Sequence, residues 1–423
     1  MRTILLISLL LAYGFTAVQA QRSCGTTNYQ QLIFSSDPSA KARFEAIERQ
    51  SKRLPIGMLR EYGDNPAADT ILTIPVVVHV LYNKGQQNIS DQQINSQIDA
   101  LNRDFNRLNT EVNQIPSPFA GLVATGKIRF QLARVDPDGR ATTGIVRKKT
   151  DVSSFSSGDD RIKFNNTGGD NAWNRHSYLN IWVGPLVSTA LGYSSLPGLT
   201  TDDKDGVVIR YDVFGTTGGV QAPYNMGRTL THELGHWLGL KHLWGDLPCG
   251  DDGIDDTPPQ QGYHTGCPSF PQISAGCNMT ASGELFMNFM DFTDDGCMYM
   301  FTQGQKDEMR SLFDQGGYRY DIAYSNALGN PWNESPRMAP DSSNVLNIYP
   351  NPVAQQVTIR STRSDISLTG KTFTIHNAMG QIVMTGKIQQ ENQVLLVGAL
   401  HSGVYFIKVA DGSSKWLTRF VKE

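Results

Sequence analysis

Apolar and polar positions along this chain predict first a mixed sheet with helices. Residues 70–82, TILTIPVVVHVLY, are rich in β-branched side chains, which favours a central strand. Beyond them Ile94, Ile98 and Leu101 recur at near-helical spacing behind a Ser90 and Gln93 pair that is typical of a capping box, so we expect an amphipathic helix on the sheet. Further strands are expected in KIRFQLARV, YLNIWVG and DGVVIRYDVFG, at residues 127–135, 178–184 and 205–215.

The pattern changes near residue 322. A segment rich in Pro, Asn and Ser follows, which indicates a linker at residues 323–344. Residues 345–423 then read as many short strands separated by Gly, Asn and Asp, with one apolar and one polar face. This part of the chain predicts a small β-sandwich.

Length and charge narrow the function classes. With 423 residues the chain is long enough for two or three domains, and 39% apolar residues is ordinary globular composition. A net charge of -3 gives no reason to expect nucleic acid or an anionic membrane as a partner.

Residues 1–20 have a basic start, an apolar run and a small-residue end, which predicts a secretory signal peptide. A membrane anchor is the weaker interpretation, since the run is short for a bilayer and no later stretch is apolar enough.

The stretch THELGHWLGLKHLW, residues 231–244, carries the chemistry. As a helix it places His232 and His236 one turn apart on one face, where both imidazoles can bind one metal ion. Glu233 lies beside them as a base for a metal-bound water. Gly239 lets the chain leave the helix and present His242 as a third ligand.

Packed or exposed histidines remain the alternative for a short motif, but the added Gly and His make coincidence remote. The pattern resembles the metzincin zinc metallopeptidases, and Met290 in NFMDF matches the methionine of their Met-turn. Trp237, Asp256-Thr257-Pro258 and Cys297-Met298 resemble the pappalysin family in particular. The resemblance implies an α+β fold, namely a twisted mixed sheet with an active-site helix, followed here by an immunoglobulin-like sandwich.

Four of the five cysteines lie within fifty residues of one another, and in an exported protein they should form two disulfides. Three connectivities are possible, and the resemblance favours Cys249 with Cys277 and Cys267 with Cys297. A cysteine zinc site is the rival interpretation, although no C-x-x-C spacing is present.

Cys24 is the odd cysteine and lies in a charged segment that would make a poor core, so we expect a propeptide at residues 21–60. A thiolate is a strong zinc ligand, and Cys24-Gly25 resembles the cysteine switch of metzincin zymogens. The alternative is an inert cysteine. Arg53 and Arg60 are plausible cleavage points.

Three further expectations follow from the family. The glycine-bounded stretch LGYSSLPG, residues 191–198, resembles the edge strand that binds a polypeptide substrate, with an ordinary hairpin as the alternative. The acidic loop after the zinc helix resembles a calcium site with Asp252 and Thr257 as members, or is a solvated acidic cluster. Asp295 matches the acid of the specificity pocket, which would select Lys or Arg just after the scissile bond, unless it is a surface acid.

One residue departs from the family. Phe292 stands where pappalysins commonly carry a tyrosine two residues after the methionine. Since its ring has no hydroxyl, it cannot bind zinc or donate to a developing oxyanion.

At the C-terminus the string YPNP, the strand GVYFIKV and the end FVKE resemble the sorting domain of type IX secretion substrates. That resemblance implies export across the outer membrane to the cell surface or medium, with the type IX machinery as partner. An adhesion or substrate-binding module is the alternative.

Together these patterns predict a secreted zinc endopeptidase made as a latent zymogen, without a transmembrane anchor. The expected order is signal peptide 1–20, propeptide 21–60, catalytic domain 61–322, linker 323–344 and sorting domain 345–423. A zinc-stabilised binding protein without catalysis is the alternative from another class, and Phe292 is the one feature in its favour. An exopeptidase is the other alternative, with no charged pocket visible to capture a terminus.

Overall fold

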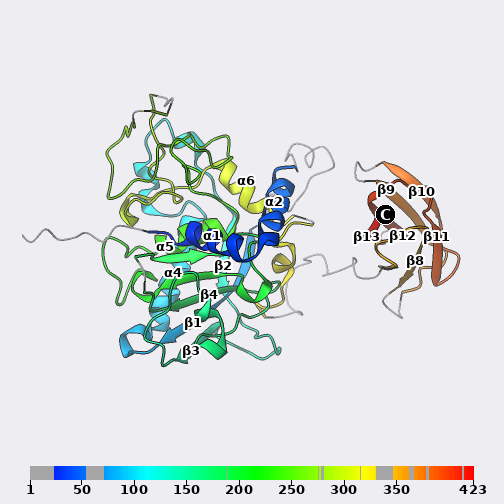
Figure 1. Cartoon of the computed structure of the whole chain (residues 1–423), viewed down its shortest axis with the longest axis horizontal. Coiled ribbons are helices and arrows are strands. Elements are labelled where there is room, and N and C mark those ends of the chain that lie inside the picture. The colour runs from blue at the N-terminus through cyan, green and yellow to red at the C-terminus, as the bar shows by residue number, and fades with distance from the viewer. Residues whose placement is uncertain are drawn as a thin grey trace, which may run out of the picture. The chain divides into compact units, whose positions relative to one another are not determined.

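The strand that the sequence predicts as central, β1 (Leu72–Tyr82), is an interior strand with partners on both sides in the computed structural model of the chain (Figure 1). β2 (Ile128–Leu132) pairs in parallel with its first half and β3 (Ile145–Lys149) with its second half. On the other side lie β4 (Leu179–Gly184), then β6 (Val207–Arg210), both parallel to β1.

The sheet ends in a short antiparallel strand, as a substrate-binding edge strand would. β5 (Gly192–Ser194) pairs with β6 through Gly192 and Ile209 at one end and Ser194 and Val207 at the other. The pairing confirms the expected mixed sheet and makes β5 its antiparallel edge.

The structure describes most of the chain, and two compact units are separable in it, residues 1–331 and 332–423. The expected signal peptide, the end of the propeptide with Arg60, and most of the linker lie outside the described residues. The described residues are 23–53, 71–187, 189–274, 276–277, 281–314, 316–329, 346–361, 366–377, 381–411 and 414–423.

Helices cover one face of the sheet. Val76, Val78 and Val80 of β1 pack there against α4 (Asp91–Asp104) and α5 (Arg228–Trp237). Every residue of α5 is buried, so the helix that carries the zinc motif lies under the sheet within the main core. The other α-helices among the described residues are α1 (Thr26–Ser36), α2 (Pro38–Arg53) and α6 (Gln303–Ser311).

The start of α4 differs from the expected capping box in one contact. Ser90 caps the helix, since its hydroxyl accepts a hydrogen bond from Gln93 N at 3.1 Å. The Gln93 side chain does not reach back to Ser90. Its amide instead donates to the Phe214 carbonyl at 2.8 Å.

The opposite face of the sheet has its own core. Leu81, Trp182 and Val208 point to this side, and Tyr193 of the edge strand joins them. Tyr29 of α1 packs into the same core, although α1 lies in the expected propeptide. The two faces of β5 therefore have different surroundings.

The first unit continues beyond the expected end of the catalytic domain. Ala327 is fully buried, and its carbonyl accepts hydrogen bonds from Arg134 N and Val135 N at 2.7 and 3.0 Å. No helix of the described part of the chain is long and apolar enough to cross a membrane.

The second unit is a sandwich of two antiparallel sheets with the orders β10-β9-β12-β13 and β11-β8-β7. Its core, with Val357, Ile375 and Ile407 among its buried residues, comes from its own strands. The expected β-sandwich is confirmed. The strands are β7 (Leu346–Tyr349), β8 (Gln356–Ser361), β9 (Thr372–Asn377), β10 (Ile382–Lys387), β11 (Asn392–Leu396), β12 (Gly403–Asp411) and β13 (Ser414–Lys422).

Candidate metal centre

The three histidines of the motif converge at the end of α5. The helix ends where Gly239 adopts a φ of 93°, and the turn brings His242 back beside the helix. The Nε2 atom of His242 lies 3.0 Å from that of His236 and 3.3 Å from that of His232. Three nitrogens bound to one tetrahedral ion at about 2.0–2.1 Å would lie about 3.3 Å apart. The spacing therefore fits a shared zinc-sized ion.

Each imidazole is oriented by an acceptor on its other nitrogen. Nδ1 of His232 lies 2.7 Å from the Phe289 carbonyl, and Nδ1 of His236 lies 2.8 Å from the Leu240 carbonyl. Nδ1 of His242 lies 2.6 Å from Asp246 Oδ1. Because Nδ1–H donates to these oxygens, Nε2 keeps its lone pair for a metal.

One of the three rings, that of His236, is also held in the neutral form that a metal requires. Burial, with a contribution from neighbouring His242, lowers the pKa of His236 to about 3. A neutral imidazole is the metal-binding form, so no proton competes with a metal for His236 at neutral pH.

A fourth candidate ligand comes from the N-terminal segment. The ligand atoms of Cys24 and the three histidines all lie within 4.8 Å of one another, which makes a group of mixed sulfur and nitrogen donors. Burial and the negative charge of Glu233 raise the pKa of the Cys24 thiol well above its ordinary value. A bound cation reverses this, since a coordinating thiol loses its proton. This donor set is one that zinc accepts in closed, four-coordinate sites.

Backbone pairing brings Cys24 to this place. Leu191 N donates to the Ser23 carbonyl and Gly25 N donates to the Gly192 carbonyl, both at 2.9 Å. Cys24 thereby forms a parallel bridge with Gly192 of the edge strand. The N-terminal segment occupies the edge at which an added peptide strand would bind.

Glu233 is buried next to this edge and is engaged by the same segment. The Thr26 hydroxyl donates to Glu233 Oε2 at 2.8 Å and accepts from Ser194 N at 2.9 Å. A Cβ on Gly192 would lie 3.1 Å from Glu233 Cγ, which shows how closely the carboxylate approaches β5. Sequence reasoning did not single out Thr26.

Met290 lies directly under α5, as a Met-turn residue would. It is fully buried, and a Cβ on Gly235 would stand 2.3 Å from its sulfur. The glycine inside the helix is therefore needed for this close contact. Phe292, two residues on, packs its ring against His242 with centroids 4.9 Å apart.

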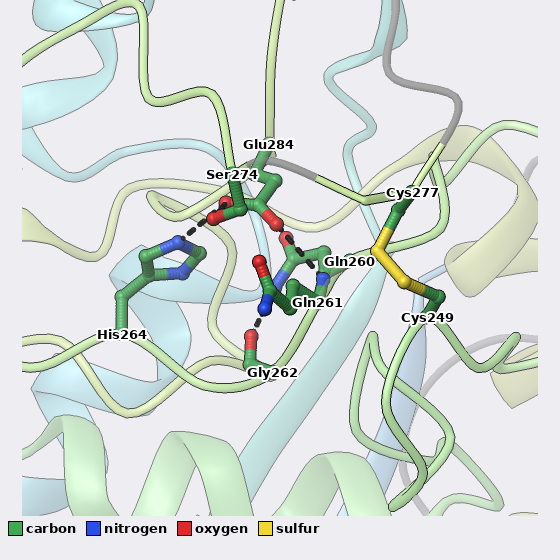
Figure 2. Close-up of a disulfide and its surroundings, with 8 residues drawn as sticks. All are labelled: Cys249, Gln260, Gln261, Gly262, His264, Ser274, Cys277 and Glu284. Atoms are coloured by element: carbon green, nitrogen blue, oxygen red, sulfur yellow. Dashed lines mark hydrogen bonds and ion pairs between the residues drawn. A yellow bond between two sulfur atoms is a disulfide. The ribbon is translucent and has the colours of Figure 1, made fainter.

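A buried ionic cluster holds Asp291, the residue that follows Met290. Nδ1 of His264 lies 2.7 Å from Asp291 Oδ2, and its Nε2 lies 2.8 Å from Glu284 Oε2. Figure 2 shows Ser274 and the backbone of Gln261 also directed at Glu284, near the Cys249–Cys277 disulfide. Hydrogen bonds and ionic contacts with these acids raise the pKa of His264 against the effect of its burial. The sequence offers no signal for this cluster, because isolated acids and a lone histidine are common.

The two disulfides have the pairing that the family resemblance implied. Cys249 is bonded to Cys277 and Cys267 to Cys297. Both tie loops of the segment that follows α5. Among the described residues Cys24 is the one free cysteine.

The acids expected beside the centre lie in different settings. Asp295 is fully buried, and its Oδ2 accepts from Met226 N at 2.8 Å and Arg228 N at 3.3 Å, just before α5. Asp252 accepts from the Thr257 hydroxyl at 2.7 Å through Oδ1, while its buried Oδ2 has no hydrogen-bond partner among the described residues.

Comparisons with known proteins agree with this site. Residues 164–314 match the family model described as pregnancy-associated plasma protein-A, and residues 347–423 match a secretion system C-terminal sorting domain. Mature mirolysin of Tannerella forsythia, in complex with a cleaved peptide, is 51% identical, with a TM-score of 0.60; the match covers 62% of this chain and all of that one.

Two further relatives extend the match. A promirolysin variant of the same organism is 46% identical with a TM-score of 0.66, covering 73% of this chain and all of that one. An extracellular metalloprotease of Arthroderma benhamiae is 31% identical over 243 residues, 55% of this chain and 74% of the relative. The chain thus belongs to the pappalysin family of metallopeptidases, as a secreted metalloendopeptidase with a C-terminal sorting domain that directs it to the cell surface or the medium.

Proposed function

We propose that this protein is a zinc endopeptidase in which His232, His236 and His242 hold the metal. The observation that carries the proposal is the convergence of three Nε2 atoms, two of them 3.0 and 3.3 Å from the third, with each Nδ1 bound to an oxygen. When bound, zinc polarises a peptide carbonyl and lowers the pKa of a coordinated water to about 7.

Glu233 does the proton chemistry in this proposal. Its carboxylate, buried beside the histidines and the edge strand, takes the proton of the attacking water and then delivers it to the leaving amine. A peptide paired with β5 would present its scissile bond next to this carboxylate. Met290 supports the histidines through its contact with Gly235.

The test compares the processed wild type with Glu233→Gln on a denatured protein substrate. Gln keeps the size of the side chain but cannot accept a proton, so we expect kcat to fall by at least about 10²-fold. Removal of zinc by a chelator should abolish cleavage in the wild type, and added zinc should restore it. Equal cleavage by the two forms would instead favour a zinc-stabilised binding protein.

We propose that the segment 21–60 keeps the enzyme latent, with Cys24 as a zinc ligand. Two features support this: the Cys24 sulfur lies within 4.8 Å of the histidine nitrogens, and Thr26 occupies Glu233 Oε2. The segment is also anchored away from the centre, where Lys241 forms an ion pair with Glu48 of α2. Cleavage after α2 would release the segment from both places.

A preference for Lys or Arg just after the scissile bond is proposed for Asp295. Its burial at the start of α5, with Cys297 tied to Cys267 two residues on, supports a fixed negative charge there. In a peptide library Asp295→Asn should reduce the preference for Arg over Leu at least about tenfold, whereas Asp294→Asn should not. If the wild type cleaved peptides equally well whatever the charge of the residue after the scissile bond, this proposal would be contradicted.

We propose a calcium ion beside Asp252 and Thr257. Burial raises the pKa of Asp252 to about 7, and its unpartnered Oδ2 is what a cation would satisfy. Carbonyls and waters would complete the six to eight oxygens that calcium takes. Calcium should raise Tm in the wild type and in Asp251→Asn but not in Asp252→Asn; an equal response in all three would contradict the site.

Phe292 leaves this chain without the hydroxyl that its relatives commonly place beside the zinc. Its ring instead packs against His232 and His242, with centroids 5.6 and 4.9 Å away. Oxyanion stabilisation would then rest on the metal, and a lower rate is expected.

A further inference from the structure

Tyr29 fills a hollow in the catalytic unit that the proposed function does not use. Tyr29 is 1% exposed, and Thr26 is the one other buried residue of α1. The hydroxyl donates to Asp160 Oδ1 at 2.7 Å and accepts from Lys163 Nζ at 3.2 Å. The ring packs on Tyr193 with centroids 5.0 Å apart, and the Lys163 ammonium lies 4.8 Å from the ring centre.

The walls of this hollow are held together without Tyr29. Asp160 Oδ1 lies 3.0 Å from Lys163 Nζ, and Asp160 Oδ2 lies 3.2 Å from Lys204 Nζ. Lys163 also donates to the Lys204 carbonyl at 2.8 Å. Because these charged groups satisfy one another, they can keep their positions when the N-terminal segment leaves. What then remains is a binding site with a carboxylate acceptor, an ammonium donor and an aromatic wall.

The hollow is adjacent to the strand at which substrate would bind. Tyr193 lies in β5 between Gly192 and Ser194, and Gly192 faces Glu233 on the other side of the strand. Directly opposed residues of paired strands place their side chains on the same face. A peptide residue opposite Tyr193 would therefore direct its side chain to the face that holds the hollow.

We propose that, once the N-terminal segment is removed, this hollow is a substrate subsite for a tyrosine side chain. A phenol fits each of these groups. Its hydroxyl donates a hydrogen bond to Asp160 and accepts one from Lys163, and its ring packs against Tyr193 and the Lys163 ammonium. Phenylalanine would keep the ring contacts and lose the hydrogen bonds. The subsite rests on the proposed function, since it needs the segment 21–60 to be released.

The processed enzyme is tested on peptides that share one scissile bond and carry alanine, phenylalanine, tyrosine or O-methyltyrosine at each flanking position in turn. At one position we expect tyrosine to exceed phenylalanine about tenfold in kcat/KM, the effect of hydrogen bonds to charged groups. O-methyltyrosine, which keeps the ring but has no hydroxyl proton, should do no better than phenylalanine. These peptides need no variant of the enzyme, so misfolding cannot explain the result.

A matched pair of variants then locates the effect. In Asp160→Ala the ratio of tyrosine to phenylalanine should fall to about one, whereas in Asp159→Ala, a neighbouring exposed acid, it should stay near tenfold. Cleavage without a tyrosine preference at any position, or a preference that survives Asp160→Ala, would overturn the subsite alone. No cleavage of any peptide by the processed wild type would overturn the proposed function and the subsite with it.

Discussion

At the scale of single residues, Thr26 and Cys24 act on different parts of the proposed centre. The Cys24 sulfur lies among the histidine nitrogens, whereas the Thr26 hydroxyl holds Glu233 at 2.8 Å and is itself held by Ser194. Latency should therefore depend on two contacts, that of Cys24 with the histidines and that of Thr26 with Glu233, and each can be removed without the other. A hydrogen bond to a charged group contributes about 1.5–3 kcal/mol, which corresponds to roughly 10- to 100-fold in an equilibrium.

We predict that Thr26→Val raises the activity of the unprocessed chain at least about tenfold, because valine keeps the shape and removes the donor. Cys24→Ala should raise it further, and the double variant most of all. The measurement is peptide cleavage with the processing site blocked. Ser36→Ala is the control, since among the described residues this hydroxyl donates only to backbone carbonyls of its own helix. If unprocessed Thr26→Val cleaved peptides no faster than the unprocessed wild type, a role for Thr26 in latency would be contradicted.

Phe292 supplies a second prediction at this scale. A tyrosine here would add one hydroxyl beside His232 and His242, at a ring that is partly exposed. An oxyanion donor contributes about 10²–10³ in kcat, so Phe292→Tyr should raise kcat about tenfold or more while KM changes little. Phe270→Tyr, at an exposed phenylalanine, is the control. An unchanged kcat would show that the hydroxyl is not needed here.

At the scale of elements, the turn around Met290 is fixed to the segment that follows α5 by the cluster of His264, Glu284 and Asp291. The histidine side chain is 9% exposed and both acids are fully buried, so their interaction is weakly screened by solvent. The pKa of His264 is raised in the folded state. Its stabilising contribution is therefore complete below the unfolded value of about 6.5 and is lost as pH rises through the folded pKa.

We accordingly predict that His264→Gln lowers the free energy of unfolding by about 2 kcal/mol on the acid side of that range and by less above it. The measurement is denaturant unfolding of wild type and variant as a function of pH. His176→Gln is the control, because His176 also lies between two acids but its side chain is 40% exposed. A loss that is independent of pH would mean that the charge of His264 does not matter.

Local patterns were enough to predict the elements but not the contacts between distant ones. The predicted elements lie where expected: the strand around Val78, the helix with Ile94 and Ile98, and the H-E-x-x-H helix. Each could be predicted because the periodicity of apolar residues is a property of residues close together in the sequence. α1 was not anticipated, since TTNYQQLIFSS has little amphipathic pattern and its burial rests on Thr26 and Tyr29 alone. The hydrogen bond of Tyr29 to Asp160, 131 residues away, could not be predicted from the residues around either one.

At the scale of the whole molecule, the two units have separate cores. The main core of the first unit contains no residue of the second among those described, and the sandwich core is built from residues 346 onward. Each unit should thus fold by itself. The second unit matches a secretion sorting domain over residues 347–423, so we assign export and not catalysis to it.

We predict that a chain ending at residue 331 unfolds at the same Tm as the first unit of the full chain and, once processed, cleaves peptides with the same kcat/KM. In a bacterium with type IX secretion, however, this shortened chain should remain in the periplasm, whereas the full chain reaches the surface or the medium. Fractionation and immunoblotting measure the difference. Residues 332–423 fused to an unrelated periplasmic protein provide the converse test, because a unit with its own core should carry a passenger across the outer membrane. A shortened chain found in the medium, with no lysis, would place the export signal in the catalytic unit instead.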